Sequence, residues 1–75
     1  PRESTAYPNV PLRMGSHGEL VGRVQERLRT RGWTLGVDRS FGPETDRTVR
    51  QFQRRRGLLD DGVVGRHTWN AIFAP

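Results

Sequence analysis

Few residues of this chain stand in the patterns that enzymes use for catalysis. His17-Gly18-Glu19 contains the His-x-Glu of zinc deaminases, but the Pro-Cys-x-x-Cys segment that completes their metal site is absent, because the chain has no cysteine. Neither the His-Glu-x-x-His metal motif nor the Gly-x-Ser-x-Gly nucleophile turn occurs. Asp60 and Asp61 are adjacent, and sequence neighbours rarely face each other across a substrate as paired glycosidase carboxylates must. The sequence therefore predicts no catalytic residue, no metal site and no cofactor.

The basic residues favour contact with anions. All 13 of them are arginines, and the net charge is +5. Such a charge favours nucleic acids and other anionic polymers. The loop Gly15-Ser16-His17-Gly18 precedes an expected helix, where free N–H groups can meet an anion, although capping of the helix explains its residues better. Acidic residues interrupt the arginines, so a solvated face that attracts anionic polymers is the preferred interpretation.

The length of 75 residues accommodates one small domain. A chain this short buries only about 60% of its unfolded surface, and without cysteine it has neither disulfides nor a cysteine-bearing zinc module as staples. No apolar run has the length of a membrane span, and no targeting pattern opens the chain. Residues 1–10 hold two prolines and no hydrophobic period, which predicts a linker or disordered tail before a domain over residues 11–75.

The first helix is predicted to begin after Ser16. Ser16 and Glu19 have the spacing of a capping box, in which the hydroxyl and the carboxylate satisfy N–H groups of the first turn. Apolar residues then recur with helical period over residues 20–28. Gly32 is a natural residue to end this helix.

Two further helices complete an all-α, three-helix bundle. Pro43 suits the first position of the second helix, because its missing N–H has no intrahelical partner there, and Gly57 ends that helix. A short third helix fits residues 66–73, where Trp69 begins an apolar spacing of three and four residues.

Two ordered loops are predicted from an internal repeat. Residues 38–45 and 61–68 share the pattern Asp-x-x-apolar-Gly-x-x-Thr at an offset of 23 residues. The aspartate can accept a hydrogen bond from its own backbone two residues on, the apolar residue pins the loop to the core, and the glycine opens the next helix. We therefore expect the same turn to be built twice.

The chain resembles a known family through an ordered series of short motifs. They are Leu12-Arg13-x-Gly15-Ser16-x-Gly18, Val21-x-x-Val24-Gln25-x-x-Leu28, Gly32-Trp33, Asp38-x-x-Phe41-Gly42-Pro43-x-Thr45, Val49-x-x-Phe52-Gln53, Gly57-Leu58 and Asp61-Gly62-Val63-Val64-Gly65-x-x-Thr68-Trp69. In this order and spacing they are similar to the type 1 peptidoglycan-binding domain of cell-wall hydrolases and phage endolysins. The resemblance covers residues 12–73.

Two departures from the family pattern each add an arginine next to a helix start. Arg39 stands where the family usually has glycine after the first aspartate, and Arg66 stands where it usually has proline. These changes leave the expected fold unaltered and bear on the ligand preference.

Most residues of the motifs are expected to support the fold. Gln25 and Gln53 follow core positions and are expected to tie a loop backbone to a helix, and Phe41 and Trp69 are expected to pack in the core. The residues with a predicted structural role are Ser16, Glu19, Gln25, Asp38, Phe41, Gly42, Pro43, Thr45, Phe52, Gln53, Asp61, Gly65, Thr68 and Trp69.

The resemblance implies a non-catalytic module that anchors an attached murein hydrolase to peptidoglycan, in the cell envelope or outside the cell, or in a phage protein that acts on the host wall. The implied ligand is the stem peptide of murein, received by a shallow groove between the helices and the two Asp-loops. Arg39 or Arg66, with N–H groups at the helix starts, are expected to bind its carboxylates. The residues expected to contact ligand are Trp33, Arg39, Ser40 and Arg66.

Two alternatives stay open. A small basic nucleic-acid-binding domain would bind with an affinity that falls steeply with salt, although the two connections are longer than the three or four residues of a helix-turn-helix turn. A structural or inhibitory pro-region is the other, since the propeptides of matrix metalloproteinases have a similar fold. Those propeptides silence zinc with a cysteine, which this chain lacks.

Overall fold

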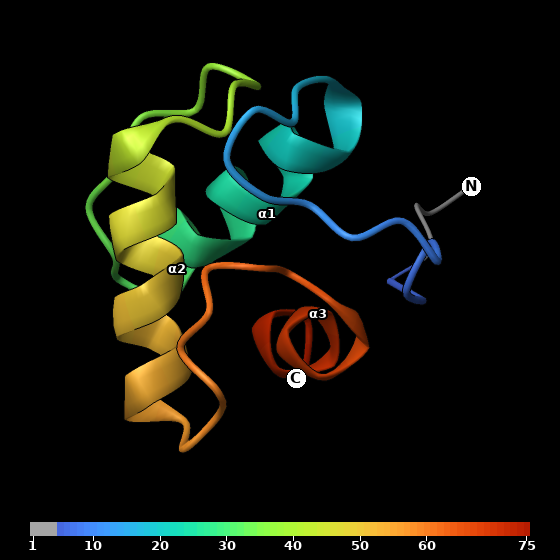
Figure 1. Cartoon of the computed structure of the whole chain (residues 1–75), viewed down its shortest axis with the longest axis vertical. Helices are drawn as coiled ribbons and strands as arrows, with labels where there is room; N and C mark the ends of the chain where they lie inside the picture. Colours follow the sequence, from blue (N-terminus) through green and yellow to red (C-terminus); the bar gives the residue numbers. More distant parts are fainter. Residues whose placement is uncertain (1–4) are drawn as a thin grey trace.

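Three helices follow one another in the computed structural model, which describes residues 5–75. They are α1 (Glu19–Thr30), α2 (Pro43–Arg55) and α3 (Arg66–Ile72). In Figure 1, α2 stands along one side of the molecule, α1 crosses beside it, and α3 is seen end-on. The described residues contain no strand, only two isolated antiparallel bridges. The predicted all-α, three-helix architecture is confirmed.

The first two helices end in the same way. At the end of α1, the N–H of Trp33 donates to the carbonyl of Leu28 at 3.0 Å, around Gly32 with φ 101°. The same bond pattern ends α2 around Gly57, whose φ is 72°. Glycine occupies this left-handed position without the steric cost that a Cβ would add.

The start of α1 differs from the prediction. The prediction of a capping box formed by Ser16 and Glu19 is wrong. Gly18 is the N-cap, with φ 121°, and no side chain caps the helix. The Ser16 hydroxyl instead accepts the N–H of Arg13 at 3.0 Å. The N–H of Gly18 donates to the carbonyl of Arg39 at 2.9 Å. Hydrogen bonds to a distant loop therefore set the conformation in which the chain enters the helix.

One apolar core lies between the helices and the loops that precede them. Phe41, from the loop before α2, and Trp69, from α3, are 1% and 0% exposed, so both pack as expected. The apolar core residues are Leu12, Val21, Val24, Leu28, Leu35, Phe41, Val49, Phe52, Val64, Trp69 and Ile72.

The segment before the domain contacts α3. The indole N–H of Trp69 donates to the carbonyl of Thr5 at 2.8 Å, and the Tyr7 ring packs edge-on against the same indole at 6.2 Å between centroids. The first four residues of the predicted tail lie outside the described part, and the boundary at residue 10 stays a prediction.

Candidate functional site

Two loops lead into the helices and have the same local geometry. We call residues 38–42 the first Asp-loop and residues 61–65 the second Asp-loop. In each, the aspartate Oδ1 accepts the N–H two residues further on, at 3.0 Å for Asp38 and at 2.9 Å for Asp61. The repeated sequence pattern therefore builds the same turn twice.

A buried glutamine of α1 holds the first Asp-loop. The Nε2 of Gln25 lies 3.0 Å from each of three acceptors, which are Asp38 Oδ1, the carbonyl of Ser40 and Thr45 Oγ1. Its Oε1 accepts the N–H groups of Asp38 and Arg39 at 3.1 and 2.9 Å. This one fully buried amide therefore forms hydrogen bonds with both N–H and carbonyl groups of the loop backbone.

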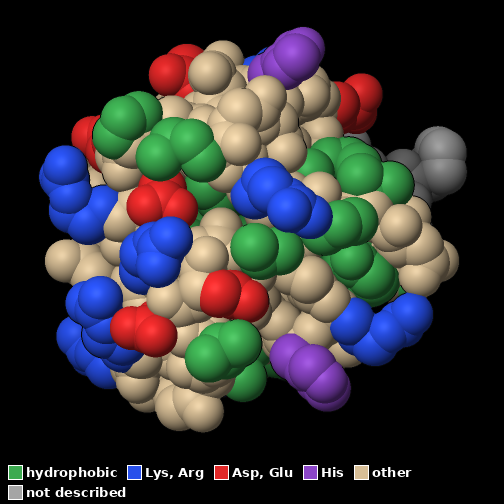
Figure 2. All heavy atoms as spheres, viewed as in Figure 1, with side chains coloured by type: hydrophobic (Ala, Val, Ile, Leu, Met, Phe, Trp, Pro, Cys, Tyr) green, Lys and Arg blue, Asp and Glu red, His purple; other side chains and the backbone are tan. Residues whose placement is uncertain are grey.

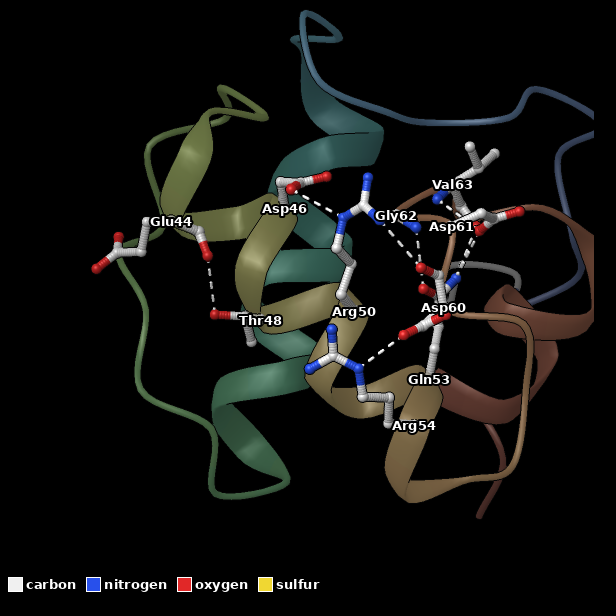
Figure 3. A network of polar contacts seen from close by, with 10 residues as sticks. All are labelled: Glu44, Asp46, Thr48, Arg50, Gln53, Arg54, Asp60, Asp61, Gly62 and Val63. Atoms are coloured by element: carbon white, nitrogen blue, oxygen red, sulfur yellow. Dashed lines mark hydrogen bonds and ion pairs between the residues drawn. The ribbon is translucent and has the colours of Figure 1, made fainter.

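Gln53 of α2 plays the same part for the second Asp-loop (Figure 3). Its Nε2 donates to Asp61 Oδ1, the carbonyl of Val63 and Thr68 Oγ1 at 3.0–3.1 Å, and its Oε1 accepts the N–H of Gly62 at 3.0 Å. Both glutamines are fully buried, so their amide groups are turned to the loops and away from a ligand.

Charged residues of α2 also hold Asp60, the residue that precedes the second Asp-loop (Figure 3). Arg50 bonds Asp46 at 3.1 Å and the carbonyl of Asp60 at 3.0 Å, and Arg54 bonds the Asp60 carboxylate at 2.7 Å. This last bond is the main cause that lowers the pKa of Asp60. Figure 2 shows basic and acidic side chains interspersed on this side of the molecule.

A hollow of about 340 Å³ lies beside the second Asp-loop, and we call it the loop hollow. Leu59 is the most exposed large apolar side chain in the described part of the chain, at 77%, and it lines this hollow with Leu58 and Val63. Arg66 supplies a positive charge to the same lining. The full lining is Gly57, Leu58, Leu59, Asp61, Val63, Gly65, Arg66, His67 and Thr68.

Arg66 reaches the loop hollow from the first position of α3. Its Nη2 donates to Asn9 Oδ1 at 3.0 Å, and its guanidinium lies 5.2 Å from the centre of the Tyr7 ring. A guanidinium has five N–H donors, so these contacts orient the group and leave other donors for a ligand. Because α2 opens with Pro43, which has no N–H, and α3 has only seven residues, the guanidinium is a better anion partner here than the helix starts.

The other predicted ligand residues lie elsewhere. Arg39 adopts φ 64°, and its side chain lies across α1 where a Cβ on Gly22 would come within 3.0 Å of it. The backbone N–H of Ser40 donates to Asp38 within the first Asp-loop, and its carbonyl accepts from Gln25 of α1. Trp33, Arg39 and Arg66 each line a different hollow, so the structure does not gather the four predicted residues around one site.

Sequence reasoning did not single out Leu59 as a ligand residue. The signal that was available is its position, since it is an apolar residue two places after the glycine that ends α2, outside any helical period. Only the structure shows that its side chain is exposed in a hollow that Arg66 also lines.

Acid pH is expected to weaken the first Asp-loop. The hydrogen bond from Gln25 lowers the pKa of the Asp38 carboxyl below its ordinary value of 3.8, and the N–H of Ser40 lowers it further. The charged form is therefore favoured in the folded state, and its stabilising contribution is complete above the ordinary pKa and lost as pH falls through the folded-state pKa. We expect the free energy of unfolding to fall as the pH drops below about 4, and to fall less in Asp38→Asn, when measured by urea denaturation.

The remaining acid sensitivity of Asp38→Asn is expected to include Asp60, whose pKa is also lowered and which is present in both proteins. A fall of equal size in the variant and the parent would show that the charge of Asp38 does not stabilise the loop.

The described residues offer no cluster of three or more metal-ligating side chains. Within residues 5–75, no helix is long and apolar enough to cross a membrane.

Comparison with known proteins identifies a family that this chain matches. The family described as "Putative peptidoglycan binding domain" matches residues 17–72. The zinc D-Ala-D-Ala carboxypeptidase of Streptomyces albus G is 40% identical over 65 residues, which are 83% of this chain and 26% of that protein. A spore cortex-lytic enzyme of Bacillus cereus is 39% identical over 64 residues, which are 84% of this chain and 25% of that enzyme. The chain thus spans about a quarter of the length of these curated relatives.

Solved structures agree with this assignment. The SleB N-terminal domain superposes with a TM-score of 0.83 at 37% identity, covering 89% of this chain and 93% of that domain. The endolysin of Burkholderia phage AP3 also gives a TM-score of 0.83, at 35% identity, over 87% of this chain and 25% of the endolysin. The sequence match and the shared three-helix fold together show that this chain belongs to the peptidoglycan-binding domain family of cell-wall hydrolases.

Proposed function

We propose that this domain is a non-catalytic anchor that holds an attached murein hydrolase on peptidoglycan. Support comes from the family and from the relatives, which are wall-acting enzymes about four times as long as the matched region. An anchor of this kind raises the effective concentration of the linked catalytic domain at its substrate. The module then acts in the cell envelope or outside the cell, whether a bacterium or a phage encodes it.

The loop hollow is the proposed place of contact with the stem peptide of murein. The observation that carries this assignment is the exposed side chain of Leu59 in a hollow that Arg66 also lines. A stem peptide combines small apolar side chains with carboxylates. Leu58, Leu59 and Val63 offer an apolar wall for the first, and a guanidinium can bind a carboxylate through two parallel hydrogen bonds.

Trp33, Arg39 and Ser40 lie outside the loop hollow. We propose that they contact the wall only where the polymer extends beyond the hollow. Single alanine variants at these positions are therefore expected to weaken binding less than changes at Leu59 or Arg66.

Leu59→Ser is expected to reduce binding to murein sacculi roughly tenfold, because it removes most of an apolar contact worth about 1.5 kcal/mol or more. The measurement is co-sedimentation with sacculi freed of teichoic acid, at about 0.05 M and about 0.5 M salt. Met14→Ser is the matched control, since Met14 is 50% exposed and lines none of the hollows described above. Arg66→Gln is expected to weaken binding as well.

The parent domain is expected to pellet at both salt concentrations. Pelleting only at low salt would show that the arginines bind charge without a shaped site, which is the behaviour expected of a nucleic-acid-binding domain. Failure to pellet at either salt would contradict the anchor function for that murein. Equal loss in Leu59→Ser and Met14→Ser would overturn the assignment of the loop hollow and leave the anchor function standing.

A further inference from the structure

A second, larger hollow lies at the C-terminal ends of α1 and α2, and we call it the basic groove. Its volume is about 540 Å³. Three arginines line it and no carboxylate does, in contrast to the loop hollow, which contains Asp61. The lining residues are Arg31, Gly32, Trp33, Thr34, Thr48, Gln51, Phe52, Arg55 and Arg56.

The charges of Arg55 and Arg56 have no acidic partner within the described part of the chain. Arg54, their neighbour, forms an ion pair with Asp60, but no ion pair among residues 5–75 reaches Arg55 or Arg56. Both guanidiniums rest on aromatic rings, Arg55 at 5.7 Å from the centre of Trp33 and Arg56 at 5.2 Å from that of Phe52. A ring positions the flat group and leaves its N–H donors free for an anion.

The third arginine of the groove is held in place. Arg31 donates to the carbonyls of Ile72 and Ala74, so its side chain is fixed between α1 and the end of the chain. Burial lowers the pKa of Arg31, and repulsion from Arg27 and Arg56 lowers it further. The groove therefore concentrates positive charge that an anion would relieve.

Helix capping does not account for these arginines. Cations near a helix C-terminus are favourable by roughly 0.3–1 kcal/mol. At the end of α2, however, the N–H groups of Gly57 and Leu58 already bond the carbonyls of Arg54 and Gln53 at 3.1 and 2.8 Å. The helix end is thus closed by its own backbone, and the arginine side chains remain available to solvent or a ligand.

We propose that the basic groove binds a phosphodiester polymer of the cell wall, with polyol units between its phosphates. The guanidiniums of Arg55 and Arg56 can each hold a phosphate through two hydrogen bonds, and the polar side chains of Thr34 and Gln51 in the same lining can hydrogen-bond the hydroxyls of the polyol. The choice of a wall polymer rests on the proposed wall-anchoring function. Nucleic acid fits less well, because single strands are bound by stacking bases on open aromatic faces, and Arg55 lies over the ring of Trp33.

The test is the affinity of the domain for purified poly(glycerol phosphate), measured by titration calorimetry at several salt concentrations. The double variant Arg55→Gln with Arg56→Gln is expected to raise Kd about tenfold, since each lost charge contact is worth up to about 1 kcal/mol, and to make the salt dependence shallower. Arg13→Gln with Arg47→Gln is the matched control. It removes the same charge from two exposed side chains that line none of the hollows described above.

Three results would overturn this inference. They are equal weakening by the two double variants, tighter binding of single-stranded DNA with the same number of phosphates, and equal binding of polyglutamate, whose charges are carboxylates. Binding to sacculi without teichoic acid is measured in parallel and is expected to survive in Arg55→Gln with Arg56→Gln. A basic groove that does not bind the phosphodiester polymer can therefore be distinguished from a domain that does not bind the cell wall.

Discussion

Replacing Gln25 with leucine is expected to lower the free energy of unfolding by about 3 kcal/mol or more. The side chain is fully buried and makes five hydrogen bonds to the first Asp-loop and to the start of α2. Leucine has nearly the same volume, so the loss is polar and leaves no large cavity.

The groups that lose a partner decide the size of this effect. The N–H groups of Asp38 and Arg39 and the carbonyl of Ser40 belong to an exposed loop, where water replaces part of what is lost. Thr45 is only 2% exposed, so its Oγ1 has no such access to water. A buried polar group left without a partner costs about 1–3 kcal/mol. Because water replaces part of what the exposed groups lose, the total loss of stability is smaller than the sum of five separate hydrogen bonds.

Gln51→Leu is the control for Gln25→Leu, because Gln51 is exposed on α2 and its side chain forms no hydrogen bond within residues 5–75. It is expected to change the free energy of unfolding by about 0.5 kcal/mol or less. Urea denaturation followed by circular dichroism measures both variants. A Gln25→Leu domain as stable as Gln51→Leu would show that the loop does not depend on the buried amide.

Gly62→Ala is expected to lower the free energy of unfolding by about 2 kcal/mol. Gly62 has φ 74°, a conformation that costs a residue with a Cβ about 1 kcal/mol. A Cβ there would also overlap Asp46 Oδ1 and lie 3.0 Å from Arg50 Nε. The pair of Asp46 and Arg50 would have to move, which weakens the bond from Arg50 that holds the carbonyl of Asp60, the residue before the second Asp-loop, against α2.

The equivalent position of the first Asp-loop provides the reciprocal test. Arg39 stands there with φ 64°, so Arg39→Gly is expected to leave the free energy of unfolding unchanged or to raise it by up to about 1 kcal/mol. Gly36→Ala is a control, because its φ is outside the left-handed region and its Cβ would meet Glu44 at an ordinary 3.6 Å. A Gly62→Ala domain as stable as Gly36→Ala would contradict the argument from backbone conformation.

Much of the fold follows from local sequence. Pro43 at the start of α2, and Gly32 and Gly57 at the ends of the first two helices, act within one turn of the chain, and the structure has the helix boundaries that they predict. The repeat at an offset of 23 residues also predicts two equivalent turns, because an aspartate that bonds its own backbone needs no distant partner.

The way α1 begins is not predicted correctly from the local sequence. Ser16 and Glu19 have the spacing of a capping box, yet the N–H of Gly18 is taken by the carbonyl of Arg39 and the Ser16 hydroxyl by the N–H of Arg13. A hydrogen bond from Gly18 to a residue 21 positions away competes with the local cap. That distant partner cannot be identified before the fold is known.

The position and order of the three helices and the repeated Asp-loops are predictable from the sequence, since each depends mainly on residues close together in the chain. Which side chains share a surface becomes apparent only in the folded domain. It separates Trp33, Arg39 and Arg66 into three hollows, and it places Leu59 with Arg66 and Trp33 with Arg55. The exposure of a side chain depends on how the helices pack over it, and packing is settled by contacts between residues that are far apart in sequence.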